Sequence, residues 1–232
     1  VLDLDSFAAI RKTKRAEITE IKKHRRVPVG PDATFYFESY DTMWWQIHEM
    51  LFIEKGGDEQ VNDELEAYNP LIPQGDELVA TLMFEIDDPA RRKDLLMKLG
   101  GVEEMCFLEV GQDKIKADAE TDVDRTSAQG KASSVQFLHF KLSSRQLDLI
   151  KQKDTSITLS IEHPEYGHSA KIQGETREAL LKDFDVKLAI LCNLVDSLMF
   201  LLIFVFFFVI NFFIIIIKTK FYLLNKPIIN FR

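Results

Sequence analysis

Histidine is the side chain of this sequence best suited to metal binding or to proton transfer near neutral pH. No two of the five histidines have the i, i+4 spacing that places two ligands on one helix face, and there is no HExxH motif. His163 and His168 flank the segment 164–167, so a bent loop would bring both imidazoles close to Glu165. Such a group suits zinc or iron. In the alternative interpretation the segment is a turn whose histidines are solvated or hydrogen-bonded.

The segment 43–54 combines acids, a histidine and two tryptophans in one predicted helix. Glu49 and Glu54 offer carboxylates for a metal or for acid–base chemistry. A di-iron bundle uses Glu-x-x-His pairs on facing helices, and this segment contains none, so an amphipathic core helix is the alternative. A metal-dependent or metal-sensing protein is one hypothesis, and its weak candidate ligands are His24, His48, Glu49, Glu54, His163 and His168.

The motifs of the common nucleotide-binding and hydrolytic sites are absent. The sequence contains no GxGxxG, no GxxxxGK[ST] and no GxSxG. Cys106 and Cys192 have no CxxC partner, and Cys106 is interpreted as a small buried hydrophobic residue within a strand. The sequence therefore defines no catalytic residue and no cofactor, and it favours a binding protein over an enzyme.

Charge is distributed unevenly along the 232 residues, whose formal net charge is −8. Residues 1–185 carry 24 Lys and Arg against 36 Asp and Glu, which argues against nucleic acid as a partner because phosphate binding needs clustered cations. The one dense basic run is 22–26. We interpret it as a solvated helix end, with an anion site as the alternative.

The hydrophobic periodicity of residues 1–185 alternates between helices and strands. Helices are expected over 4–25, 43–54 (capped by Asp41 or Thr42), 59–68, 89–99, 144–151 and 176–184, and strands over 34–38, 78–86, 105–110, 135–142 and 156–161. Prolines and glycines between 27 and 32 are expected to end the first helix, and 113–131 is predicted as a loop or irregular hairpin arm. The predicted fold class is α+β, an antiparallel or mixed sheet with covering helices on one side.

The C-terminal segment differs from this domain. Leu198 to Ile217 is a run of 20 residues with Asn211 as its one polar member, long enough for a single transmembrane helix. We therefore divide the chain into a domain at 1–185, a linker at 186–197, the hydrophobic helix at 198–217 and a basic tail at 218–232. Without a secretory signal the domain is expected in the cytoplasm, although the basic tail favours a cytoplasmic location for the opposite end.

A second interpretation of this segment comes from its composition. Of residues 198–232, 29 are Phe, Ile, Leu, Asn, Lys or Tyr, and none is Ala, Gly, Asp or Glu. AT-rich codons specify such residues, so a frameshift or read-through would also produce this tail. The protein would then be soluble and cytoplasmic.

Several stretches of the sequence resemble an uncharacterised bacterial family, a domain of unknown function of about 190 residues. The resemblance covers roughly residues 2–185. It rests on 24–27 with Gly30, on 46–50, on 67–73 (which contains YNPLIP), on 135–138 and on the His163-Pro164-Glu165-Tyr166 stretch.

The resemblance implies a role rather than an activity. Members of the family are often encoded beside a rubrerythrin and an iron–sulfur oxidoreductase. This implies an accessory or binding protein of a peroxide or redox module, with a rubrerythrin-like or iron–sulfur protein as its partner. Members usually end near the last helix of the domain, so the C-terminal tail departs from the family.

Overall fold

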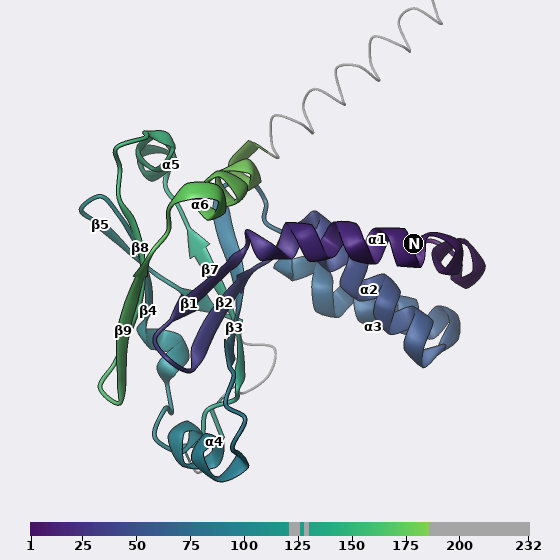
Figure 1. The fold of residues 1–232 in the computed structure, drawn as a ribbon, viewed down its shortest axis with the longest axis horizontal. Coiled ribbons are helices and arrows are strands. Elements are labelled where there is room, and N and C mark those ends of the chain that lie inside the picture. Colours follow the sequence, from purple (N-terminus) through teal and green to yellow (C-terminus); the bar gives the residue numbers. More distant parts are fainter. Residues whose placement is uncertain (121–125, 128–129, 186–232) are drawn as a thin grey trace, which may run out of the picture. The chain divides into compact units, whose positions relative to one another are not determined.

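The computed structural model describes residues 1–120, 126–127 and 130–185, which form two antiparallel sheets with helices around them (Figure 1). The predicted α+β class with antiparallel strands and covering helices is confirmed, although the strands make two sheets where one was expected. The predicted hydrophobic helix at Leu198 to Ile217 lies outside the described residues. Among the residues that are described, no helix has the length and apolar character needed to cross a membrane.

The first sheet, called sheet A, has five strands in the order β1-β2-β3-β7-β6. Their bounds are β1 Arg26–Val29, β2 Ala33–Phe37, β3 Glu77–Phe84, β7 Val135–Lys141 and β6 Asp118–Ala119. β1 occupies the stretch that was expected only to end the first helix. Pro28 is tolerated there because β1 is an edge strand, where a missing N–H breaks no ladder inside the sheet.

The second sheet, sheet B, has four strands in the order β5-β4-β8-β9. They are β5 Asp113–Lys116, β4 Cys106–Val110, β8 Ile157–His163 and β9 Tyr166–Lys171. β5 and β6 lie in the segment predicted as a loop or irregular hairpin arm. β9 was missed because its side chains are mostly exposed and polar, so it lacks the alternation that marks a half-buried strand.

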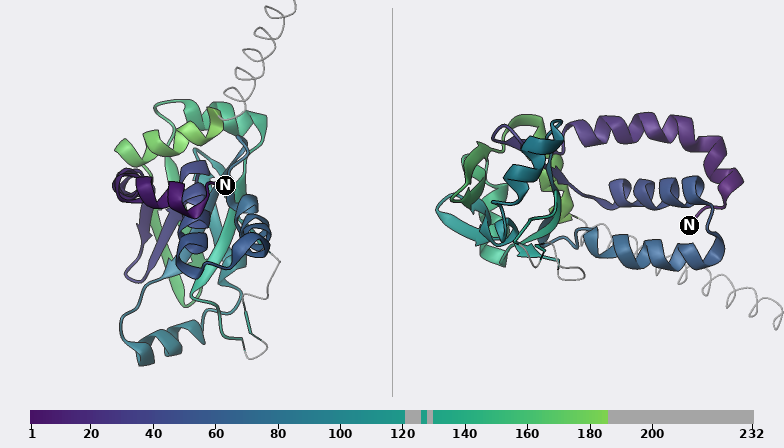
Figure 2. Two further views of the ribbon diagram at one scale, coloured as in Figure 1. Left: turned by 90° about the vertical axis from the view of Figure 1, so that its right-hand side faces the viewer. Right: turned by 90° about the horizontal axis from the view of Figure 1, so that it is seen from below.

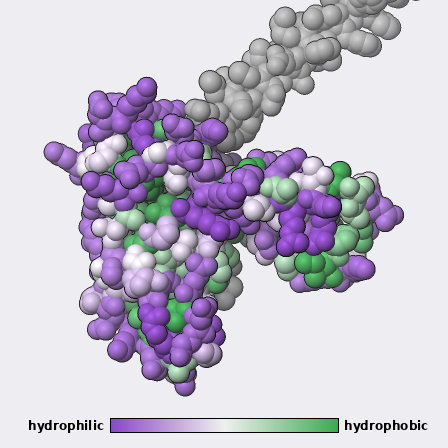
Figure 3. Space-filling model, in the orientation of Figure 1, coloured by the Kyte–Doolittle hydropathy of each residue, from purple (hydrophilic) through white to green (hydrophobic). Residues whose placement is uncertain are grey.

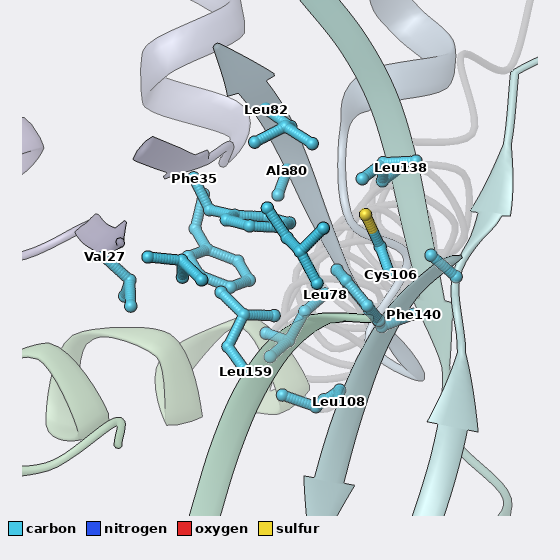
Figure 4. Packing of buried hydrophobic residues seen from close by; sticks show 14 of the residues in the cluster. Val27, Phe35, Leu78, Ala80, Leu82, Cys106, Leu108, Leu138, Phe140 and Leu159 are labelled. Atoms are coloured by element: carbon cyan, nitrogen blue, oxygen red, sulfur yellow. The ribbon is translucent and has the colours of Figure 1, made fainter. Parts of the chain in front are cut away.

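The hydrophobic core lies between the two sheets (Figure 4). Alternate residues of sheet A point into it, among them Phe35, Leu82 and Phe140, and meet Leu108 and Leu159 of sheet B. The strand period of two explains this arrangement, since every second side chain of a strand faces the same side. Cys106 lies in this core with 0% of its surface exposed, which confirms its interpretation as a buried small hydrophobe.

Short helices close the two ends of the sheet pair (Figure 1). α4 (Pro89–Leu96) and the 3-10 turn η2 (Val102–Met105) lie at one end. α5 (Ser144–Lys151), α6 (Gly174–Leu181) and the 3-10 turn η3 (Lys182–Asp185) lie at the other. α4, α5 and α6 each contribute a leucine or isoleucine to the core between the sheets.

Three longer helices form an arm that projects from sheet A (Figure 2). They are α1 (Leu4–Lys23), α2 (Tyr40–Glu54) and α3 (Gly57–Tyr68), and a 3-10 turn η1 (Asn69–Leu71) leads from α3 back to the sheet. Phe7 of α1 packs against the rings of Trp44 and Trp45 of α2. α2 begins earlier than predicted, because Ser39 rather than Asp41 or Thr42 caps it through a reciprocal capping box.

Candidate functional site

The outer face of sheet A carries a row of side chains that crosses four strands. Arg26 of β1 pairs with Tyr36 of β2, Tyr36 with Thr81 of β3, and Thr81 with Phe137 of β7. Neighbours of these residues along each strand point the opposite way, into the core. A second row, of Met83 and Val135, lies beside the first. Together the two rows form a surface that is partly aromatic and partly polar.

The base of the helical arm encloses this surface as a pocket. The end of α1 contributes Lys22, the first turns of α2 contribute Thr42, Met43 and Gln46, and the end of α3 with η1 contributes Tyr68 and Leu71. The cavity has a volume of about 390 Å³. A volume of this order, lined by apolar surface and a few polar groups, is typical of small-molecule sites.

A buried carboxylate lies inside the pocket. Glu38 directly follows β2, and its backbone N–H donates to the carbonyl of Val79. Its side chain accepts hydrogen bonds from the hydroxyl of Thr42 at 2.6 Å and from that of Thr81 at 2.8 Å. Within the described part of the chain no cation forms an ion pair with Glu38. Its charge is therefore stabilised by hydroxyl dipoles, and the remaining lone pairs of its oxygens are available for a ligand.

Cations of the basic run 22–26 line the same pocket and divide into two kinds. Arg25 is buried; it donates to the carbonyls of Phe37 and Glu38 and pairs with Asp183 at 2.5 Å. Lys22 and Arg26 form no ion pair with any described residue, and the Arg26 guanidinium lies 5.2 Å from the centre of the Tyr36 ring. The run therefore includes the exposed end of α1 at Lys23 and also supplies one wall of the pocket, with one structural arginine and two available cations.

The two tyrosines of the pocket act as neutral hydrogen-bonding groups. Burial raises the pKa of Tyr36. The phenol of Tyr36 donates a hydrogen bond of 2.6 Å to the carboxylate of Glu85, and this bond raises the pKa further. Burial also raises the pKa of Tyr68, whose hydroxyl interacts with the side chain of Gln46. Both phenols keep their protons at neutral pH, so the pocket gains no anion from them.

The structure separates the predicted metal ligands. His24 follows α1 with Nδ1 at 3.2 Å from a carboxylate oxygen of Glu175. Glu49 forms a two-point ion pair with Arg11 at 2.6 and 2.9 Å. Glu54 accepts a hydrogen bond from Gln60 on the exposed side of the arm.

His48 is buried within the arm and not within the pocket. Its Nδ1 lies 2.7 Å from the carbonyl of Trp44, and its Nε2 accepts from the N–H of Leu2 at 3.0 Å. A carbonyl can only accept, so Nδ1 carries the proton of a neutral ring. Burial lowers the pKa of His48, which favours the same neutral form.

His163 and His168 lie on the hairpin β8–β9 at different cross-strand pairs. His163 pairs with Tyr166, and His168 pairs with Ile161. His163 is buried and accepts from the backbone N–H of Glu165, whereas His168 is exposed and packs edge-on against the Tyr166 ring. Across the described residues, no group of three or more His, Cys, Asp or Glu side chains is arranged to hold a metal ion.

One titratable cluster was not anticipated from the sequence. His139 of β7 lies between two carboxylates, with Nδ1 at 3.0 Å from Glu77 and Nε2 at 3.0 Å from Glu120. Burial alone lowers the pKa of His139, but the two carboxylates outweigh burial, so its pKa is raised. Strand alternation signalled that His139 faces out of the core, but the pairing register that brings Glu77 beside it has no signal in the sequence.

The fold and the pocket together define an α+β protein of two antiparallel sheets with a small-ligand-sized cavity at the base of a helical arm. The chain belongs to the family described as "Protein of unknown function (DUF3501)", whose model matches residues 1–184. This confirms the resemblance to an uncharacterised family.

A solved structure of the same fold is similar to this chain. It is described as the crystal structure of a novel protein of unknown function from Burkholderia pseudomallei K96243. The two chains are 34% identical with a TM-score of 0.73, and the match covers 80% of this chain and 96% of the other. No curated protein matches the chain.

Four of the stretches that carry the family resemblance meet in the pocket. They contribute Arg25 and Arg26, then Gln46, then Tyr68 and Leu71, and finally Val135 and Phe137. These stretches lie far apart in the sequence, and the fold brings them together on sheet A. The pocket is therefore lined in part by residues from four of the stretches that carry the resemblance.

Proposed function

We propose that this protein binds a small organic molecule in the pocket between sheet A and the helical arm. The observation that carries the proposal is the cavity of about 390 Å³, which joins apolar walls to a few convergent polar groups. The gathering of four family stretches around it gives further support. Among the described residues no Cys, His or Ser lines the pocket, and its carboxylate, Glu38, is held by two threonine hydroxyls, so we propose binding rather than nucleophilic catalysis as the role of this site.

Methionine methyl groups provide a direct test of this proposal. Met43 and Met83 line the pocket, whereas Met97 follows α4 and is 43% exposed. The full-length chain labelled with ¹³C at its methionine methyls is screened by NMR against a fragment library. We expect binding compounds to shift the resonances of Met43 and Met83 and to leave that of Met97 unchanged.

A pocket-filling variant makes the result specific. Val135→Trp places a large side chain in the pocket and should abolish the shifts. Lys141→Trp, at the exposed end of the same strand, should retain them. A circular dichroism spectrum and a cooperative thermal transition like those of the native chain show that each variant is folded. The proposal is wrong if no compound shifts Met43 and Met83, or if the shifts survive in Val135→Trp.

The accessory role in a peroxide or redox module also stands as a proposal, supported by the family resemblance. It predicts that the full-length chain, used as bait, recovers a rubrerythrin-like or an iron–sulfur protein. Recovery of neither would count against the role. Such a partner and a small-molecule ligand are compatible, since the binding protein of a module can carry both.

The metal-dependent alternative and the membrane anchor have simple tests. Elemental analysis of the purified chain should show stoichiometric metal if His24, His48 or His163 binds one with Glu49 or Glu54. Fractionation of cells that express the native gene tests the segment Leu198 to Ile217. A full-length product in the soluble fraction would exclude the anchor.

A further inference from the structure

The pocket has opposite charges at its two sides, and this polarity restricts the ligand. Lys22 and Arg26 lie on the α1–β1 side and form no ion pair with a described residue. The carboxylate of Glu38 lies toward β3, held there by the hydroxyls of Thr42 and Thr81. A ligand that satisfies both sides carries an anionic group at one end and a hydrogen-bond donor at the other.

The register sets the width of the pocket floor. Arg26, Tyr36 and Thr81 are cross-strand neighbours on β1, β2 and β3. Neighbouring strands lie about 4.8 Å apart, so the backbones that carry Arg26 and Thr81 are separated by about 10 Å. A floor of this width, in a cavity of about 390 Å³, accommodates two fused aromatic rings.

The walls between the two sides favour a flat ring system. Tyr36, Tyr68 and Phe137 supply aromatic surface, and the thioethers of Met43 and Met83 add polarisable contacts. Guanidinium groups also stack on flat π systems, as Arg26 does on Tyr36. A flexible sugar or an aliphatic chain would leave this surface poorly matched.

We infer that the pocket binds a bicyclic aromatic acid, with its acidic group against Lys22 and Arg26 and a hydroxyl or N–H that donates to Glu38. The inference rests on the proposed small-molecule function and adds the chemical class of the ligand. The nearby structural cation, Arg25, is committed to Asp183 and to two backbone carbonyls, so it does not compete for the acidic group.

Three related probes test this inference on the full-length chain. 6-Hydroxy-2-naphthoate has both end groups, 2-naphthoate lacks the donor, and 2-naphthol lacks the acid. Calorimetry measures their affinities, and the methionine methyl resonances report where they bind. We expect 6-hydroxy-2-naphthoate to bind most tightly, about tenfold more tightly than 2-naphthol, since one tenfold step corresponds to about 1.4 kcal/mol.

Charge variants connect the affinity to the named cations. The double variant Lys22→Gln, Arg26→Gln should weaken binding of both naphthoates about tenfold and leave that of 2-naphthol unchanged. Arg15→Gln removes an exposed cation of α1 that does not line the pocket, so it should leave all three affinities unchanged. Increasing salt should weaken the two acids and not the neutral naphthol.

The outcomes separate this inference from the proposed function. If 2-naphthol binds as tightly as the acids, or if the double variant has no effect, the inference is wrong and the pocket still binds small molecules. If no naphthalene compound shifts Met43 and Met83 but another library compound does, the ligand class is again wrong. If nothing in the library shifts these methyls, the proposed function itself fails.

Discussion

Arg25 and Arg26 are adjacent in the sequence, but Arg25 forms a buried ion pair and Arg26 is exposed. Arg25 is 5% exposed and satisfies its guanidinium with Asp183 and backbone carbonyls. Arg26 is exposed and rests over the Tyr36 ring. Arg25 lies in the turn before β1 and Arg26 is the first residue of the strand, so the two side chains meet different partners although both line the pocket.

This difference predicts a large contrast in stability. Arg25→Gln leaves the carboxylate of Asp183 buried without its partner and should lower the free energy of unfolding by about 3–5 kcal/mol. Arg26→Gln removes an exposed charge and its contact with the Tyr36 ring and should change the free energy of unfolding by less than about 1 kcal/mol. Urea denaturation of both variants measures the contrast. Similar small effects would mean that the buried pair contributes little.

His139 predicts a pH dependence of stability. Its pKa is raised above the ordinary value of 6.5, because Glu77 and Glu120 hydrogen-bond to the charged ring more strongly than burial opposes it. Charged His139 therefore stabilises the fold fully below about pH 6.5, and the effect is lost as the pH rises through the raised pKa. The difference in unfolding free energy between the native chain and His139→Gln should be larger at pH 6 than at pH 9.

A second measurement checks the same prediction without any variant. An NMR titration of the His139 ring gives the pKa directly. A value at or below 6.5 would contradict the prediction.

At the scale of elements, helices were easier to predict than strand pairing. The expected helices over 4–25, 59–68 and 144–151 match α1, α3 and α5 within two residues at each end, because amphipathic stripes and capping residues are local signals. β6 has two residues and β9 is polar, so neither has a pattern that a sequence can reveal. The division into two sheets depends on which strands pair, which is not a local property.

The turn between β1 and β2 depends on a second element for its shape. The phenol of Tyr166 on β9 donates to the carbonyl of Val29 and accepts from the N–H groups of Asp32 and Ala33. Gly30 lies in this turn with φ of 76°, and a Cβ there would lie 2.6 Å from the His168 ring. The contact between sheet A and sheet B therefore needs a glycine.

Gly30→Ala should destabilise the protein by more than the strain of a positive φ. Gly57 has the same φ of 76°, but a Cβ there would meet nothing within 4 Å. Gly57→Ala should therefore cost about 1 kcal/mol from backbone strain alone, and Gly30→Ala at least about 2 kcal/mol. Thermal unfolding of the two variants compares them. If the two variants lose the same free energy of unfolding, the His168 side chain on β9 moves away from the new methyl group at no cost in stability.

At the scale of the molecule, the arm is held together by an aromatic cluster of its own. Phe7 is 1% exposed and contacts Trp44, Trp45, His48 and Phe52. Phe7→Ala removes the centre of this cluster and should cost about 3–5 kcal/mol. Hydrogen exchange should then become faster in α1 and α2 than in sheet B. A uniform increase across both sheets would show instead that the arm unfolds together with the rest of the domain.

The pocket could be predicted from the sequence only in fragments. The basic run 22–26 was considered as an anion site, and it does supply Lys22 and Arg26. The floor was not foreseeable, because Arg26, Tyr36, Thr81 and Phe137 become neighbours through the register of three strand pairs. The histidines that the sequence offered as candidate ligands do not line the pocket.

Alternate residues of the strands of sheet A face either the core or the pocket. Leu82 and Leu138 fill the core, while the residues that flank them, Thr81, Met83 and Phe137, line the pocket. Substitutions at Thr81, Met83 and Phe137 should therefore change the proposed binding pocket and leave the core between the sheets intact. A designer could alter the pocket along one face of these strands without rebuilding the other face.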